Sequence, residues 1–283
     1  MAIVVHQYRD EALDLARFTV AWLEAGGHAV RLAKDDAKSI DRAELARNDD
    51  ELAIGADLAV SVGGDGTMLR AVELAADHDV PVLGVHAGNL GYLTEVEANG
   101  ASAALGRFLV GDYDIEERLR VAVALERTGR PAGPPRAALN EAVVEKTPSG
   151  HTVRLAVHLD GEYFTTYAAD ALIVATPTGS TAYALSARGP IVAPRHRALL
   201  LTPVSPHMLF DRTLVLLAET EIRIVVASYR PASLFIDGAR LDDELAEGDA
   251  VVCRAAAKPA RLVTFGERRF HSILKAKFGL NDR

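Results

Sequence analysis

Hydrophobic and polar positions along the first hundred residues follow two different periods. Apolar side chains recur at helical spacing in residues 10–25, which predicts an amphipathic helix. Residues 34–51 carry charges of both signs and predict a solvated helix and loop. Short, continuous apolar runs predict strands at residues 3–5, 29–32, 58–62 and 81–85, with another helix at 67–76. Because continuous apolar strands separated by helices are typical of βαβ units, we predict a parallel sheet covered on both faces.

After residue 100 the pattern changes to many short strands bounded by turn signals. Residues 102–109 predict a connecting helix, and residues 270–278 are again helical. Asp160-Gly161, between two predicted strands, is a two-residue hairpin signal. The predicted strands are residues 120–126, 138–145, 153–159, 162–167, 171–175, 199–203, 213–217, 221–226, 233–236 and 250–255. This spacing favours an antiparallel sandwich.

The two patterns together predict the fold class and the domains. We expect an α/β N-terminal domain with a parallel sheet at residues 1–100, followed by a C-terminal domain rich in β-sandwich structure at residues 101–267. A C-terminal helix within residues 268–283 is expected to pack back on the first domain.

Composition excludes some classes of binding partner but says less about the fold. The 283 residues include 31 Lys and Arg and 39 Asp and Glu, a formal net charge of −8, and no dense basic cluster. A protein that binds a nucleic-acid backbone needs a basic face, so neither nucleic acid nor an anionic membrane is an expected partner. No apolar run approaches the ~18 residues that span a bilayer. A phosphorylated small ligand remains compatible, because backbone N–H groups hold phosphate without net positive charge.

Cysteine and histidine positions limit the metal and redox chemistry. Cys253 is the single cysteine, so neither an intramolecular disulfide nor a cysteine-based metal site can form. The histidines show no metal-ligand spacing, and we predict no metal site built from protein residues. The N-terminal apolar run is too short and too weakly basic for a signal peptide, so we predict a cytoplasmic protein.

A glycine-rich turn, residues 63–67 (GGDGT), joins a predicted strand to a predicted helix. This arrangement is a phosphate cradle, because inward-pointing backbone N–H groups and the helix dipole both attract an anion. The lysine of a Walker A loop is missing, and Leu69 takes the place of the third glycine of a dinucleotide-binding fingerprint. The candidate ligands of donor phosphates are Gly63, Gly64, Gly66 and Thr67.

Asp65 is the unusual residue of this turn, because a carboxylate among phosphate-binding groups repels the ligand. It could take a proton from an incoming hydroxyl or contact a metal carried on the phosphates. The alternative is that Asp65 only caps the helix. Arg70, one turn further along, is either an anion-binding residue or an ordinary surface arginine.

Two segments of the second half carry candidate chemistry. Asn140-Glu141 opens an apolar strand, and an amide beside a carboxylate suits an adenine edge and a ribose diol, although polar residues at strand ends are common. Residues 170–188 (DALIVATPTGSTAYALSAR) form a buried strand, a turn and a short helix. Ser180 lacks the Gly-x-Ser-x-Gly context of a hydrolase nucleophile and is expected to cap that helix. Asp237-Gly238 by itself predicts only a turn.

The motifs resemble those of known kinases. The GGDGT turn is shared by NAD kinases, lipid kinases and, more distantly, phosphofructokinases, whereas Asn140-Glu141 and the Gly-Ser-Thr-Ala-Tyr segment resemble bacterial NAD kinases over residues 58–254. The resemblance implies transfer of the γ-phosphoryl of ATP to the 2′-hydroxyl of the adenosine ribose of NAD, with Asp65 as general base, in a cleft between the domains. It also puts Asp237 near the site. The implied NAD-binding residues are Asp65, Gly66, Arg70, Asn140, Glu141, His151, Asp170, Thr181, Ala182, Tyr183 and Ser186.

Three positions depart from the family pattern. His86 stands where the family usually has Asn, Ala168 where it often has Arg, and Arg188 where Gly is common. Two other functions compete with this interpretation. A lipid kinase would lack the Asn-Glu and Thr-Ala-Tyr motifs, and a non-catalytic dinucleotide sensor would most simply have lost Asp65.

The resemblance implies cofactors and partners as well. Mg²⁺ is expected to arrive with ATP rather than at a resident site. The family forms homodimers or homotetramers, so a homo-oligomer is expected, with Asp170 near a subunit boundary.

Overall fold

The computed structural model describes residues 1–88, 91–130, 133–147, 151–241, 244–266 and 269–280. Asn89 and Leu90, in the bend after the predicted strand 81–85, lie outside this set, as do residues 268 and 281–283 of the predicted C-terminal segment. The chain forms two compact units, Met1–Glu117 with Ala260–Arg283 and Arg118–Pro259. Among the helices of the described residues, none has the length and apolar character needed to cross a membrane.

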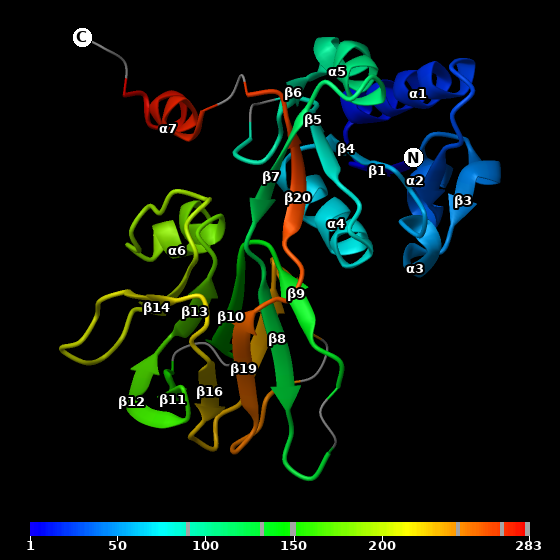
Figure 1. Ribbon diagram of the computed structural model, residues 1–283. Coiled ribbons are helices and arrows are strands. Elements are labelled where there is room, and N and C mark those ends of the chain that lie inside the picture. The colour runs from blue at the N-terminus through cyan, green and yellow to red at the C-terminus, as the bar shows by residue number, and fades with distance from the viewer. Residues whose placement is uncertain (89–90, 131–132, 148–150, 242–243, 267–268, 281–283) are drawn as a thin grey trace. The chain divides into compact units, whose positions relative to one another are not determined.

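A mainly parallel sheet forms the centre of the first unit (Figure 1). Its strands are β1 (Ala2–Val5), β2 (Arg31–Ala33), β3 (Ala46–Arg47), β4 (Ala59–Gly63), β5 (Val82–His86), β6 (Val96–Glu97), β7 (Asp114–Arg118) and β20 (Ala260–Thr264). They follow the order β3-β2-β1-β4-β5-β20-β7, with β6 beside β5. The pairs β1/β2, β1/β4, β4/β5 and β5/β20 are parallel, which confirms the predicted parallel sheet.

Helices cover this sheet on both faces, as Figure 1 shows for α1 and α5 on one side and α4 on the other. The helices of this unit are α1 (Asp10–Ala25), α2 (Lys34–Ser39), α3 (Asp49–Leu52), α4 (Asp65–Ala75), α5 (Ala101–Leu109) and α7 (Phe270–Phe278), with 3-10 turns η1 (Ala43–Leu45), η2 (Ala76–His78) and η3 (Ala98–Gly100). α7 buries none of its residues, and its packing on the first domain stays a prediction. Alternate residues of β4 and β5, such as Val60, Val62, Leu83 and Val85, belong to one buried core with the apolar faces of α1 and α5. The residues between them, including Gly63 and His86, therefore point to the face that α4 covers.

The boundaries of the two units differ from the predicted domain boundaries at residues 100 and 267. α5 buries Ala104, Leu105 and Phe108 in the core of the first unit, although residues 101–267 were expected to form the second domain. β20, which the hydrophobic pattern did not single out, returns to the first sheet beside β5. Both segments join the first unit because their apolar side chains complete its core.

Two antiparallel sheets of six strands form the second unit, which confirms the predicted sandwich. One sheet has the order β15-β14-β13-β10-β17-β18, built from β15 (Leu214–Leu217), β14 (Ala198–Val204), β13 (Ala171–Ala175), β10 (Glu141–Lys146), β17 (Ala232–Ile236) and β18 (Ala239–Arg240). The other has the order β12-β11-β16-β19-β8-β9, built from β12 (Glu162–Ala169), β11 (Val153–Leu159), β16 (Ile222–Val226), β19 (Ala250–Ala255), β8 (Val121–Glu126) and β9 (Arg136–Ala138). Their inner faces share one buried apolar core.

The hairpin between β11 and β12 has the predicted two-residue loop. Asp160 and Gly161 have φ angles of 51° and 85°. A two-residue turn with both central residues at positive φ matches the right-handed twist of the flanking strands. The Asp-Gly pair therefore fixes the register in which Leu159 lies opposite Glu162.

Tyr167 provides a test of the sandwich core. Its side chain is fully buried, burial raises the pKa of its hydroxyl to about 12, and no described residue bonds that hydroxyl. Because an unpartnered buried hydroxyl costs stability, Tyr167→Phe should raise the free energy of unfolding in urea by about 1 kcal/mol. Tyr163→Phe, on the same strand with an exposed ring, is the control and should change it by less than about 0.5 kcal/mol. A destabilised Tyr167→Phe protein would contradict this account.

Candidate functional site

The glycine turn of the first unit ends β4 and begins α4, as the sequence predicts. Gly64 is the N-cap of α4, and Asp65 is its first residue. A Cβ on Gly63 would overlap Thr67 Oγ1, so the strand and the helix pack too closely there for any side chain. A Cβ on Gly64 or Gly66 would meet nothing within 4 Å. The first turn of α4 therefore has open space beside its N–H groups, which suits an anion.

The Asp65 carboxylate is fixed by the loop that follows β5. Its Oδ2 accepts the N–H of Tyr92 at 2.9 Å, and its Oδ1 accepts the N–H of Leu93 at 3.0 Å. A Cβ on Gly91 would overlap the same carboxylate, so a glycine is required there. No side chain caps α4, so the alternative in which Asp65 only caps the helix does not hold. Each carboxylate oxygen keeps a lone pair, so the group can still accept a proton.

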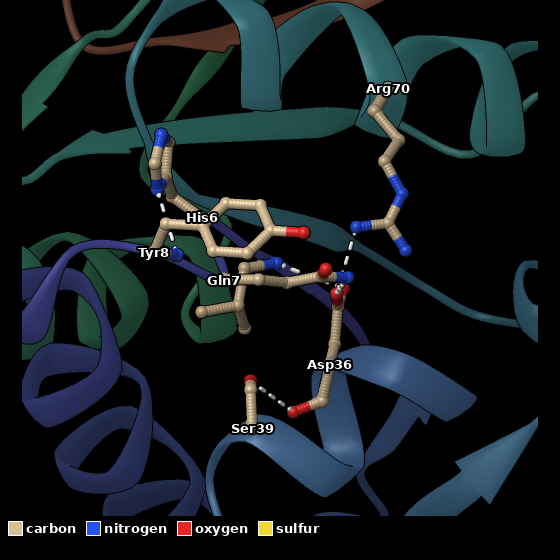
Figure 2. Close-up of polar contacts among 7 residues, drawn as sticks. His6, Gln7, Tyr8, Asp36, Ser39 and Arg70 are labelled. Carbon is tan, nitrogen blue, oxygen red and sulfur yellow. Dashed lines mark hydrogen bonds and ion pairs between the residues drawn. The ribbon is translucent and has the colours of Figure 1, made fainter.

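Two further residues of the first unit bear on this turn. His86 lies opposite Gly63 in the β4/β5 register, is 7% exposed, and has its Nδ1 3.2 Å from Gly88 O. Its Nε2 has no partner among the described residues. Arg70 forms an ion pair of 2.8 Å with the buried Asp36, shown in Figure 2, so it is not an ordinary surface arginine.

In the second unit, Asp237 holds the backbone that carries Asn140 and Glu141. Its carboxylate accepts three consecutive N–H groups, from Leu139 at 2.7 Å, Asn140 at 2.8 Å and Glu141 at 3.1 Å. Asp237 itself has φ of 47°, as its turn position requires. The sequence predicted a turn at Asp237 and the family resemblance implied a place near the site; in the structure, Asp237 holds the backbone of the Asn-Glu pair.

Glu141 is a buried carboxyl group with an unused oxygen. Its side chain is 7% exposed, and its Oε2 has no partner among the described residues. Burial raises the pKa of Glu141 to about 8, and the negative charge of Asp237 adds to that rise, whereas the Tyr183 N–H lowers it. Because β10 alternates its side chains, Glu141 lies on the same face as Val143, opposite the sandwich core. A buried acceptor of this kind suits a ligand hydroxyl.

The segment after β13 covers that outer face. A Cβ on Gly179 would overlap the Asn140 carbonyl oxygen, so the two backbones touch directly. Thr176 Oγ1 donates to Leu139 O at 2.5 Å and accepts the Gly179 N–H at 3.1 Å, which ties the segment to the start of β10. Sequence reasoning did not select Thr176, because a threonine at a strand end has no distinctive pattern.

Ser180 and its neighbours form the 3-10 turn η4 (Gly179–Thr181) and the short helix α6 (Tyr183–Ser186). Ser180 is fully buried, donates to Pro177 O at 2.7 Å and accepts the Val192 N–H at 3.0 Å. The expectation that it caps the helix is wrong, since neither η4 nor α6 has a side-chain cap. Thr181 and Ala182 are half-buried, whereas Tyr183 and Ser186 are exposed.

The Tyr183 N–H hydrogen-bonds the Glu141 carboxyl at the start of β10, whereas Asp170 lies beside Lys146 at the other end of the strand. Burial raises the pKa of Tyr183, and the charges of Glu145, Asp170 and Glu141 raise it further. Asp170 also forms an ion pair of 2.6 Å with Lys146, which the sequence did not single out. Glu141 and Asp170 therefore lie at opposite ends of β10, and the NAD-binding set stays a prediction.

Two other positions that the sequence analysis singled out, His151 and Arg188, lie in connections between elements. His151 is exposed in the bend before β11. Arg188, just after α6, has φ of 64°, a left-handed conformation that glycine adopts without strain. Over the described part of the chain, no group of three His, Cys, Asp or Glu side chains could hold a metal ion.

Comparisons with known proteins agree with each unit. Residues 1–113 match the family model of the ATP-NAD kinase N-terminal domain, and residues 139–265 match that of the ATP-NAD kinase C-terminal domain. An NAD kinase from Heliobacterium modesticaldum is 40% identical over 278 residues, which covers 98% of this chain and 97% of that protein. An NAD kinase from Citrifermentans bemidjiense is 36% identical over 287 residues, covering 100% of this chain and 99% of that protein.

Two solved structures are similar to the whole chain. The crystal structure of yeast NADH kinase complexed with NADH has a TM-score of 0.91 and 26% identity, and covers 100% of this chain and 88% of that one. The crystal structure of an NAD kinase from Archaeoglobus fulgidus in complex with ATP has a TM-score of 0.75 and 25% identity, and covers 99% of each chain.

The raised pKa of Glu141 predicts a pH-dependent stability. A carboxyl group whose pKa is about 8 when folded and ~4.3 when unfolded stabilises the fold at low pH, and this contribution is lost as pH rises through 8. The Glu141→Gln side chain cannot ionise, so its contribution to the free energy of unfolding does not fall as the pH rises. Relative to the unsubstituted protein, the variant should gain roughly 2–5 kcal/mol of unfolding free energy between pH 5 and pH 9. Urea titrations at both pH values measure it, and an equal difference at the two would refute the prediction.

Proposed function

The chain belongs to the ATP-NAD kinase family and is an NAD kinase, and we propose that it transfers the γ-phosphoryl of ATP to the 2′-hydroxyl of the adenosine ribose of NAD, giving NADP. The single observation that carries the choice of acceptor is the Glu141 carboxyl, which is buried, held in place by its neighbours and left with an unused oxygen. Ribose hydroxyls would donate the hydrogen bonds that this oxygen lacks.

The proposed NAD contacts are the residues that the family resemblance implies. Asn140 and Glu141 hold the adenosine half, with Thr181, Ala182, Tyr183 and Ser186 lining the pocket, while Asp170 serves the nicotinamide half and His151 is a further ligand contact. Asp65, Gly66 and Arg70 contribute from the first unit. The hydrogen bond from the Tyr183 N–H to the buried Glu141 carboxyl supports the choice of these two residues.

The donor phosphates are proposed to bind at Gly63, Gly64, Gly66 and Thr67, where the N–H groups of the first turn of α4 favour negative charge. Mg²⁺ enters as the complex with ATP and neutralises charge on the transferred phosphoryl. Asp65 takes the proton from the 2′-hydroxyl as the new O–P bond forms. Its two backbone hydrogen bonds keep the carboxylate in one orientation for this transfer. The proposed compartment is the cytoplasm, which supplies both substrates.

We also propose that the protein is a homo-oligomer. β12 and β15 end their sheets and carry exposed apolar side chains, among them Tyr163, Val215 and Leu217. Phe164 of β12 packs on Phe210, in the connection between β14 and β15, with ring centroids 5.9 Å apart. An unpaired, apolar strand edge favours pairing with another chain, and a second copy offers the same edge in return.

NAD and MgATP incubated with the protein should yield NADP, and Asp65→Asn should lower turnover by about 10²–10⁴-fold, the usual effect of losing a general base. NAD affinity, measured by calorimetry on the same preparation, should persist, because the glycine turn and the Glu141 pocket remain. Turnover near that of the unsubstituted protein would refute the base assignment. Loss of NAD binding together with turnover would instead show that Asp65 serves only to anchor the Tyr92-Leu93 loop.

Light scattering at micromolar concentration tests the assembly. The unsubstituted protein should be a dimer or tetramer, and Val215→Lys with Leu217→Lys should shift it to a smaller species, because buried like charges at an edge repel. Tyr229→Lys is the control, since Tyr229 is exposed but lies in the β16–β17 connection. A monomer with full activity at that concentration would count against the oligomer.

A further inference from the structure

Asp36, in the first turn of α2, is a fully buried carboxylate within a segment that the sequence predicted to be solvated. Burying a charge is costly unless that charge is paired and hydrogen-bonded. Figure 2 shows how the cost is met, with groups from three parts of the first unit meeting at this one side chain. None of the functions described so far uses it.

The two carboxylate oxygens of Asp36 serve different partners. Oδ2 accepts the backbone N–H of Val5 at 3.0 Å, at the end of β1. Oδ1 accepts the Gln7 Nε2 at 2.7 Å and the Arg70 Nη1 at 2.8 Å. Oδ2 therefore holds the end of β1. Oδ1 holds the side chains of Gln7, which follows β1, and of Arg70, which lies on α4.

Arg70 keeps part of its guanidinium free. Only its Nη1 contacts a described residue, and its side chain is 31% exposed. The Nε and Nη2 donors therefore remain available to an anion. Since Arg70 lies on α4, whose first turn forms the proposed phosphate cradle, a phosphate is the ligand chemistry that fits.

We propose that Asp36 is a positioning residue that fixes the Arg70 guanidinium so that its free donors meet a phosphate of NAD. The inference rests on the proposed function, which includes Arg70 among the NAD contacts. An arginine side chain rotates about several bonds, and a binding site loses affinity when such a group is not held in its productive orientation. The ion pair with Asp36 supplies that restraint while leaving the outer donors to the ligand.

Asp36→Asn separates this role from support of the strand. An asparagine can keep its carbonyl oxygen toward the Val5 N–H, and its amide group then replaces Oδ1, the acceptor that Arg70 uses. The Gln7 amide can rotate so that its oxygen accepts a hydrogen bond from the new amide group at position 36. The experiment is a double-mutant cycle of Asp36→Asn and Arg70→Ala, with KM for NAD, kcat and melting temperature measured for each protein.

Each single variant should raise KM for NAD about tenfold, the effect of losing one charge-assisted hydrogen bond, with a smaller change in kcat. In the Arg70→Ala background, Asp36→Asn should raise KM by less than about twofold, because its effect passes through Arg70. Ser39→Ala is the matched control. It removes a hydrogen bond to the Asp36 carbonyl oxygen at 2.7 Å, leaves the carboxylate untouched, and should keep KM unchanged.

Three results would overturn the inference. Asp36→Asn could lower the melting temperature with KM unchanged, it could raise KM equally in both backgrounds, or Arg70→Ala could leave KM unchanged in an enzyme that still makes NADP. Failure of the unsubstituted protein to make NADP would instead refute the proposed function. If Asp36→Asn does not fold, Arg70→Lys carries the test. A lysine has a single ammonium group and cannot bind Asp36 and a phosphate of NAD at once. Arg70→Lys should therefore raise KM for NAD as much as Arg70→Ala does, and an unchanged KM would overturn the inference.

Discussion

The Asp237 carboxylate accepts three consecutive backbone N–H groups at the start of β10, and the candidate acceptor pocket depends on this interaction. A strand that begins at a site has N–H groups without ladder partners, and an oriented carboxylate satisfies several of them at once. The same solution recurs in the first unit. Asp65 holds the Tyr92 and Leu93 N–H groups, and Asp36 holds that of Val5. In each case one acidic side chain fixes a segment distant in sequence.

Close backbone contacts complete this arrangement. Gly91 meets the Asp65 carboxylate, and Gly179 meets the Asn140 carbonyl, in both cases where a Cβ would overlap its neighbour. The carboxylates and glycines therefore act together, since the anchored segment must approach closely enough for its N–H groups to reach the acceptor. Gly179 belongs to a segment that the family resemblance assigned to ligand binding, and its first physical role is to let two parts of the protein touch.

The two candidate reactive carboxyl groups differ because their surroundings differ. Glu141 is almost fully buried, and burial raises its pKa to about 8. Asp65 is only half-buried, and its two oxygens accept the N–H groups of Tyr92 and Leu93. The first is suited to hydrogen-bonding ligand hydroxyls, and the second to receiving a proton beside phosphates. Arg70, paired with Asp36, adds a cation to the same unit as Asp65.

The sequence by itself determined the features that local patterns encode. Continuous apolar runs predicted the parallel sheet of the first unit, Asp160-Gly161 predicted the β11/β12 hairpin of the second, and the glycine turn marked the start of α4. The two-residue period of side chains along a strand places Glu141 and Val143 on one face of β10. Only the structure shows that the sandwich core lies on the opposite face.

Tertiary structure decided the contacts that join distant segments. Asp36 appeared solvated in a charged segment, yet Arg70, 34 residues later, pairs with it in the interior. Asp237 reaches Leu139 across 98 residues, and β20 returns to pair with β5. No local period signals such pairings, because a buried charge is stable only once the fold has brought its partners to it.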